Sequence, residues 1–189
     1  KMRRREFILG TNTTFNDACV TELLGDCGFD FIWIDMEHTT ITKDSAVQHL
    51  IACRASGAAS FVRIPWNDPV LAKPILDMGA DGIIIPQIRS YDEAVAAVAA
   101  MKYPPKGVRG WAPVRASDYG LDTQAYMTEY GDDRTLCLPQ IEHIGAVRDI
   151  ERICTIEGID ALVIGPMDLS ASLGKLGQIH DPEVEAAIE

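Results

Sequence analysis

The chain has 189 residues and a mass of 20.7 kDa, and 47% of its residues are hydrophobic, so it can fill one sizeable core. Its net charge of −11 disfavours nucleic acid and anionic membrane surfaces, which bind to clustered Lys and Arg. The basic N-terminal end, Lys1 and Arg3 to Arg5, is followed by no apolar stretch of signal-peptide or membrane-spanning length, so we predict a soluble protein.

The five cysteines indicate a reducing compartment. They are scattered, odd in number and without CxxC spacing, so they predict neither a disulfide framework nor a zinc site. We therefore expect buried or inert thiols in a cytoplasmic protein.

Short β-branched runs alternate with helical stretches along the whole chain. Each run ends in polar residues and is followed by apolar residues three and four apart, which is the pattern of βα units. The predicted strands are residues 7–11, 31–35, 60–64, 82–86, 136–141 and 161–164. The predicted helices are residues 16–27, 43–56, 68–78, 91–101 and 144–153, with a further start at residue 181.

The strand sequences predict a parallel sheet closed into a barrel. The runs at residues 83–85 and 161–164 are apolar without alternation, as expected of strands covered on both faces. The chain has no glycine-rich dinucleotide or phosphate motif, and polar residues follow the carboxyl ends of many strands instead. We predict a single (β/α)8 TIM-barrel domain over residues 1–189 with about six βα units present and the C-terminal units missing.

The long connection at residues 102–119 is rich in Pro, Gly and Arg. We expect a binding loop there, at the same end of the sheet as the polar residues.

Two carboxylates, Glu142 and Asp168, lie one βα unit apart and follow adjacent predicted strands. They could share one divalent cation, since oxygen ligands suit Mg2+ or Mn2+. The alternative is that each carboxylate only caps the next helix.

Three residues at two other strand ends could bind an anion or move a proton. Arg63 ends a buried strand, so it should face either a substrate carboxylate or enolate, or a structural acid such as Asp35 or Glu37. Asp35 and His38 are close enough for a proton relay, although capping of Thr39 or Thr40 by Asp35 would explain the same spacing. Gly165, directly after the last strand, would let a ligand approach backbone N–H groups.

Six stretches, in this order, resemble the HpcH/HpaI aldolase family, whose members include 4-hydroxy-2-oxoheptanedioate and 2-dehydro-3-deoxyglucarate aldolases. They are residues 31–38 (FIWIDMEH), 62–63 (VR), 76–80 (LDMGA), 103–110 (YPPKGVRG), 140–142 (QIE), and 158–160 with 164–174 (GID, IGPMDLSASLG).

The resemblance implies a class II aldolase that cleaves a 4-hydroxy-2-oxo acid reversibly into pyruvate and an aldehyde. A divalent ion, Mg2+, Mn2+ or Co2+, would be held by Glu142 and Asp168 and by the substrate. Arg63 would stabilise the enolate oxygen, and Asp35 with His38 would transfer protons. The remaining expected contacts are Glu37 and Gln140 with metal-bound water, Gln140 with the substrate, and the backbone around Gly165, Met167 and Asp168 with the substrate carboxylate.

The resemblance also implies a homo-oligomer, a hexamer in the family, with no nucleic-acid or membrane partner. One departure, Trp111 to Val114 after Arg109-Gly110, leaves the aldehyde specificity open. Two other functions remain at this point, an acyl-CoA thioester lyase related to citrate lyase, or an inactive truncated barrel that acts as a binding module.

Overall fold

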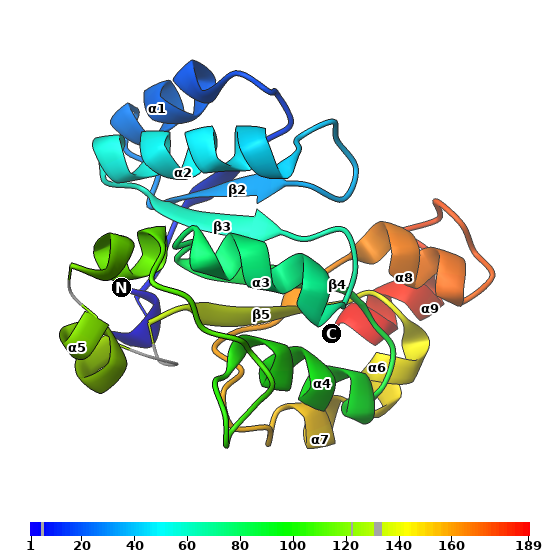
Figure 1. Ribbon diagram of the computed structural model, residues 1–189. Helices are drawn as coiled ribbons and strands as arrows, with labels where there is room; N and C mark the ends of the chain where they lie inside the picture. Colours follow the sequence, from blue (N-terminus) through cyan, green and yellow to red (C-terminus); the bar gives the residue numbers. More distant parts are fainter. Residues whose placement is uncertain (5, 122, 131–133) are drawn as a thin grey trace.

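In the part of the chain that the structure describes, six strands form one parallel sheet that curls into an incomplete barrel (Figure 1). The computed structural model describes residues 1–4, 6–121, 123–130 and 134–189. Each strand pairs with the next one along the chain, in the order β1-β2-β3-β4-β5-β6. The strands are β1 (Gly10–Thr13), β2 (Phe31–Asp35), β3 (Ala59–Arg63), β4 (Gly82–Ile88), β5 (Leu136–Ile141) and β6 (Val163–Ile164).

Helices connect the strands and cover the outer face of the sheet. Their starts follow local capping chemistry, because Thr42, Asp68 and Ser90 each accept a hydrogen bond from a backbone N–H of the first turn. The α-helices are α1 (Ala18–Asp26), α2 (Lys43–Ser56), α3 (Pro69–Asp77), α4 (Tyr91–Met101), α5 (Thr123–Ala125), α6 (Ile144–Arg148), α7 (Ile150–Ile153), α8 (Pro166–Ser172) and α9 (Pro182–Ile188). The other helical segments are the 3-10 helices η1 (Met2–Arg4) and η2 (Arg115–Gly120) and the π-helix η3 (Tyr126–Tyr130).

The predicted α/β barrel fold is confirmed, with local differences in the elements, among them a last strand that is only Val163–Ile164 instead of residues 161–164. The helix predicted at residues 144–153 is two helices, because Asp149 between α6 and α7 has non-helical backbone angles. The strand predicted at residues 7–11 begins only at Gly10. Helix α8 was not predicted, because it begins at Pro166, directly after a strand and a glycine.

Side chains alternate between two environments along each strand. The main core lies between sheet and helices and includes Ile32, Ile34, Val62 and Ile83. The residues that alternate with them along the strands point to the inside of the barrel. There Phe31 and Phe61 stack with ring centroids 4.6 Å apart. The same alternation carries Asp35, Arg63 and Gln140 to the inner face at the carboxyl ends of β2, β3 and β5.

The carboxyl ends of the strands point toward the side of Figure 1 where α6, α8 and α9 lie. The connection at residues 102–119 lies at the opposite end. Arg109 pairs with Asp77, and Arg115 donates to the carbonyl of Met78, both at the C-terminal end of α3. Helices run antiparallel to the strands they follow, so their C-terminal ends lie beside the amino ends of the strands. The prediction that this connection borders the polar cluster is therefore wrong.

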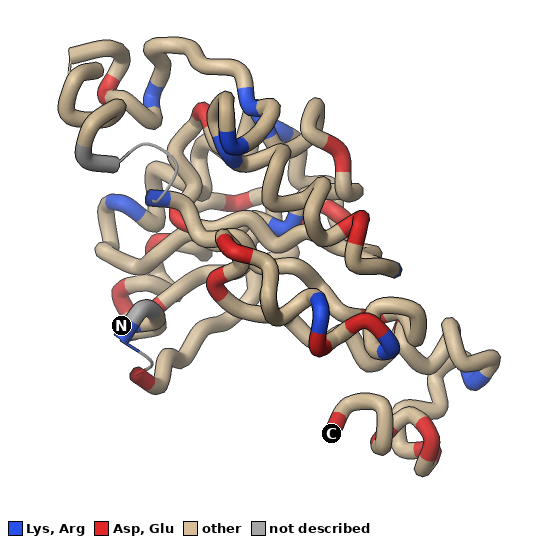
Figure 2. The backbone as a smooth tube through the Cα atoms, turned by 90° about the horizontal axis from the view of Figure 1, so that it is seen from below, with Lys and Arg blue, Asp and Glu red and all other residues tan. Residues whose placement is uncertain are grey.

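Acidic and basic residues are interspersed along the backbone (Figure 2). Within the described residues, each helix is too short or too polar to span a bilayer.

Candidate functional site

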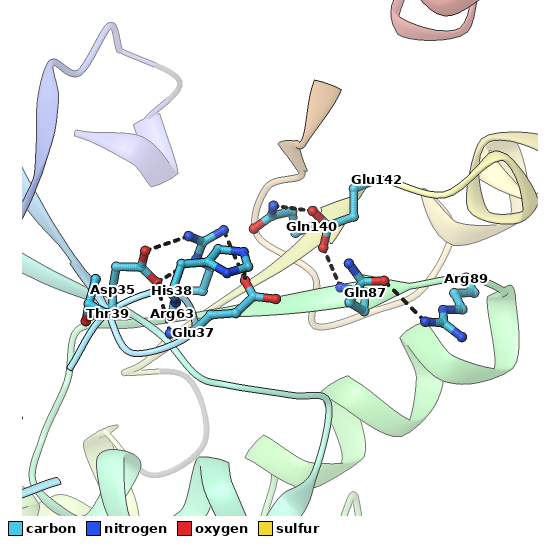
Figure 3. A network of polar contacts seen from close by, with 9 residues as sticks. All are labelled: Asp35, Glu37, His38, Thr39, Arg63, Gln87, Arg89, Gln140 and Glu142. Atoms are coloured by element: carbon cyan, nitrogen blue, oxygen red, sulfur yellow. Dashed lines mark hydrogen bonds and ion pairs between the residues drawn. The ribbon is translucent and has the colours of Figure 1, made fainter. Parts of the chain in front are cut away.

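Asp35 and Arg63 form a two-point ion pair at the carboxyl ends of β2 and β3. The register of these strands sets Asp35 beside Arg63, and both side chains point to the inside of the barrel. Arg63 Nε donates to Asp35 Oδ1 at 2.9 Å, and the terminal Nη2 donates to Oδ2 at 2.7 Å (Figure 3). The Arg63 guanidinium also lies 5.0 Å from the centre of the Trp33 ring. Its orientation is thus set by two residues of the neighbouring strand β2, Trp33 and Asp35.

Glu37 lies between Arg63 and His38. Its Oε2 is 3.1 Å from Arg63 Nη1 and 3.5 Å from Nε2 of His38, whose side chain is 62% exposed. Asp35 contacts the backbone of His38 instead of the ring, and accepts its N–H at 3.4 Å. The structure therefore places Asp35 at the end of β2 and His38 in the turn that follows, but the His38 ring contacts Glu37 and not Asp35.

The two acids of this cluster have pKa values shifted in opposite directions. Burial acts to raise the pKa of Asp35, but hydrogen bonds from Arg63 and from the N–H groups of Glu37 and His38 lower it overall. Burial raises the pKa of Glu37, because the charge of Arg63 only partly offsets desolvation and the nearby charges of Glu142 and Asp35. Asp35 therefore stays ionised to a lower pH than an ordinary aspartate, whereas Glu37 binds a proton more readily than an ordinary glutamate.

Glu142 follows β5 and is only 2% exposed. Its Oε1 accepts the backbone N–H of Gln87 at 2.6 Å, and its Oε2 accepts the side-chain amide of Gln140 (Figure 3). Gln87 aims its N–H at Glu142 because β4 has a bulge between Ile85 and Ile88, where Gln87 adopts a left-handed φ of 58°. Two neighbouring strands thus hold this carboxylate in one orientation.

Asp168 lies in the first turn of α8, just after β6. Burial raises the pKa of Glu142, and the negative charge of Asp168 raises it further, while the N–H groups of Gln87 and Gln140 oppose the shift. The two predicted metal ligands are therefore close enough to repel each other. A cation between them would relieve that repulsion.

The surroundings of Glu142 fit a small cation with oxygen ligands. Gln140 is 4% exposed, and its Oε1 has no hydrogen-bond partner among the described residues. A Cβ at Gly165 would lie 2.5 Å from Glu142 Oε2, so only glycine leaves room beside the carboxylate. Within the described ranges, no group of three or more His, Cys, Asp or Glu could hold a metal. The protein would supply two carboxylates and leave other positions to water and substrate.

Other site residues lie further out or act through the backbone. Met167, on α8, is 56% exposed, and its carbonyl accepts the hydroxyl of Ser170 at 2.6 Å. The polar character of Gln87 marked its strand end in the sequence, but the role of its N–H depends on a bulge that no sequence periodicity reveals. The contact of Glu37 with His38 likewise has no signal in the spacing.

Comparisons of the sequence and of the fold with known proteins point to one family. The sequence profile described as HpcH/HpaI aldolase/citrate lyase matches residues 10–189. The chain is 43% identical over 181 residues to a hydroxypyruvate/pyruvate aldolase from Sagittula stellata, covering 95% of this chain and 71% of that protein. It is 39% identical over 188 residues to a 2-dehydro-3,6-dideoxy-6-sulfogluconate aldolase from Pseudomonas putida, covering 99% and 73%. A crystal structure from Burkholderia cenocepacia, from the same family, matches with a TM-score of 0.93 at 33% identity, covering 99% and 77%.

Proposed function

We propose that this chain, which belongs to the HpcH/HpaI aldolase/citrate lyase family, cleaves a 4-hydroxy-2-oxo acid reversibly into pyruvate and an aldehyde. The observation that carries this proposal is the arrangement around Glu142. A buried carboxylate is held by Gln87 and Gln140, feels the charge of Asp168, and lies on the same inner face as Arg63. Fixed anions and a fixed cation at one barrel mouth suit a reaction that develops negative charge on an oxygen.

Glu142 and Asp168 are the proposed ligands of a divalent ion, Mg2+, Mn2+ or Co2+. When bound, such an ion polarises the keto group and neutralises charge on the pyruvate half of the substrate. Gln140 Oε1, buried and without a described partner, is available to orient a water molecule or a substrate group. Gly165 keeps the space beside Glu142 open, and the backbone near Met167 and Asp168 would receive the substrate carboxylate.

The residues of β2 and β3 would handle protons and charge. In cleavage, the 4-hydroxyl loses its proton, the C3–C4 bond breaks, and its electron pair moves to the pyruvate half as an enolate, which then takes a proton at C3. Arg63 would stabilise the enolate oxygen. His38, with Glu37 at 3.5 Å, would carry the proton, and Asp35 would hold Arg63 in place. A homo-oligomer and a cytoplasmic location remain proposals that rest on the family resemblance.

Pyruvate release from a 4-hydroxy-2-oxo acid tests the proposal. We expect release by the purified protein, loss after EDTA, and recovery with Mg2+, Mn2+ or Co2+. Glu142→Gln should lower turnover by at least about 100-fold, because a neutral amide is a poor ligand for a divalent cation. Release that EDTA does not affect, or a borohydride-trapped lysine adduct with pyruvate, would contradict the metal mechanism. Activity only on an acyl-CoA thioester would support the citrate-lyase-like alternative instead.

A further inference from the structure

Arg89 lies just beyond β4, on the outer rim of the barrel mouth. Its Nη2 donates to Oε1 of Gln87 at 3.3 Å, while the backbone N–H of Gln87 donates to Glu142 at 2.6 Å. Gln87 therefore links the buried carboxylate of Glu142 to the exposed guanidinium of Arg89. Figure 3 shows Gln87 between Glu142 and Arg89, and the Arg89 side chain is exposed.

The Arg89 side chain has no carboxylate at ion-pair distance within the described part of the chain. Other arginines do: Arg54 pairs with Asp118, and Arg63 with Asp35 and Glu37. The carboxylate of Glu93, on α4, accepts the backbone N–H of Arg89 at 2.7 Å. The guanidinium thus keeps its capacity to bind an anion.

Trp66, which follows β3, makes a second contact with the Arg89 guanidinium. The two groups are 5.5 Å apart, measured from Arg89 Cζ to the ring centre, and Trp66 is 47% exposed. Gln87 Oε1 accepts a hydrogen bond from Nη2, and the guanidinium carbon lies over the indole ring. This arrangement limits the conformations of the side chain and leaves donors free for a planar carboxylate or a sulfonate.

The side chains of the protein give the mouth of the barrel an excess of acidic groups. Glu142, Asp168 and Glu37 are acidic, and Arg63 is already paired with two carboxylates. In a chain of net charge −11, an anionic group at the far end of a substrate would be repelled unless a cation lay near it. Arg89 occupies a position from which it can meet such a group, outside Gln87 and Glu142.

We propose that Arg89, positioned by Gln87 and Trp66, is a subsite for an anionic terminal group on the aldehyde half of the substrate. This inference rests on the proposed aldolase function. It makes Arg89 a specificity-determining residue that discriminates charged from neutral aldehydes and takes no part in breaking the carbon–carbon bond.

The test compares two four-carbon aldehydes, succinic semialdehyde and butanal, as acceptors for pyruvate with metal present. Arg89→Met should raise KM for succinic semialdehyde about tenfold, the loss of one charge-assisted hydrogen bond, and change butanal kinetics by less than about twofold. Arg89→Lys, which keeps the charge but lacks the planar fork, should lie between. Arg54→Met is the matched control, because it removes the same charge at the opposite end of the sheet.

Ionic strength provides an independent readout. Added salt should raise KM for succinic semialdehyde in the wild type and much less in Arg89→Met, because an exposed charge pair is screened. Equal effects of Arg89→Met on both aldehydes, or none on either, would overturn the subsite while leaving the aldolase proposal intact. No addition to either aldehyde by the wild type, together with no pyruvate release in the cleavage assay, would overturn the function and the subsite with it.

Discussion

The carboxylate of Asp35 makes two hydrogen bonds to the guanidinium of Arg63, at 2.9 and 2.7 Å. It does not contact the ring of His38, which lies beside Glu37. Asp35 therefore orients the guanidinium of Arg63. In the predicted proton relay, the carboxylate beside the His38 ring is Glu37 and not Asp35.

Asp35→Asn should lower the free energy of unfolding by about 3 kcal/mol at pH 7, because it leaves a largely buried Arg63 without its main partner. The pKa of Asp35 is lowered in the fold, so its stabilisation exists above the unfolded pKa of about 4 and is lost as pH falls through the folded value. Urea unfolding from pH 7 to pH 3 measures both effects. Asp26→Asn, at an exposed position, is the control, and equal stability of the two variants at pH 7 would contradict the prediction.

Arg63→Lys should reduce kcat/KM for cleavage by about 10²–10³-fold, since a lysine cannot reproduce the two-point contact with Asp35 or face a developing oxyanion in the same way. The matched control is Arg109→Lys, which alters another buried arginine paired with an aspartate, Asp77, at the amino ends of the strands. That variant should lose stability and keep its turnover. Similar kcat/KM values for both variants would assign Arg63 a purely structural role.

Gly165→Ala should weaken metal binding, because its Cβ would lie 2.5 Å from Glu142 Oε2. The measurement is the rise in stability between EDTA and added Mn2+, which reaches about 2.7 kcal/mol when the metal is at 100 times its Kd. Gly110→Ala is the control, since its Cβ would meet only the flexible end of Lys73 at 3.1 Å. An equal metal-dependent rise in both variants would show that Gly165 does not keep the site open.

His49 should make the stability depend on pH. It lies on α2 and is fully buried, with Nδ1 2.7 Å from Oγ1 of Thr21 on α1, and burial lowers its pKa. The unfolded chain therefore binds a proton first, so stability is full above pH ~6.5 and falls as pH drops toward the folded pKa. Urea midpoints from pH 8 to pH 5 should fall less steeply in His49→Gln than in the wild type. The exposed His180→Gln should behave like the wild type, and parallel curves for all three proteins would exclude the effect.

Several elements follow from local sequence. Strands β2 and β5 and helices α2 and α4 have the predicted boundaries, because apolar periodicity and capping residues such as Thr42 and Ser90 act over a few residues. Neither helix α8 nor the path of residues 102–119 follows from the local sequence. The first begins at a glycine–proline step, and the second depends on contacts of Arg109 and Arg115 with the end of α3. The extent of the domain and the catalytic roles of the site residues stay predictions.

The sequence by itself determined which residues line the mouth of the barrel. In parallel strands, alternate side chains face inward and all carboxyl ends meet at one edge, so Asp35, Arg63 and Glu142 are predicted to lie at the same end of the barrel. Only the tertiary structure decided which of them touch. The register of β2 and β3 pairs Asp35 with Arg63, and the bulge in β4 turns the N–H of Gln87 toward Glu142, because contacts between strands depend on alignment across the sheet, which spacing along the chain does not encode.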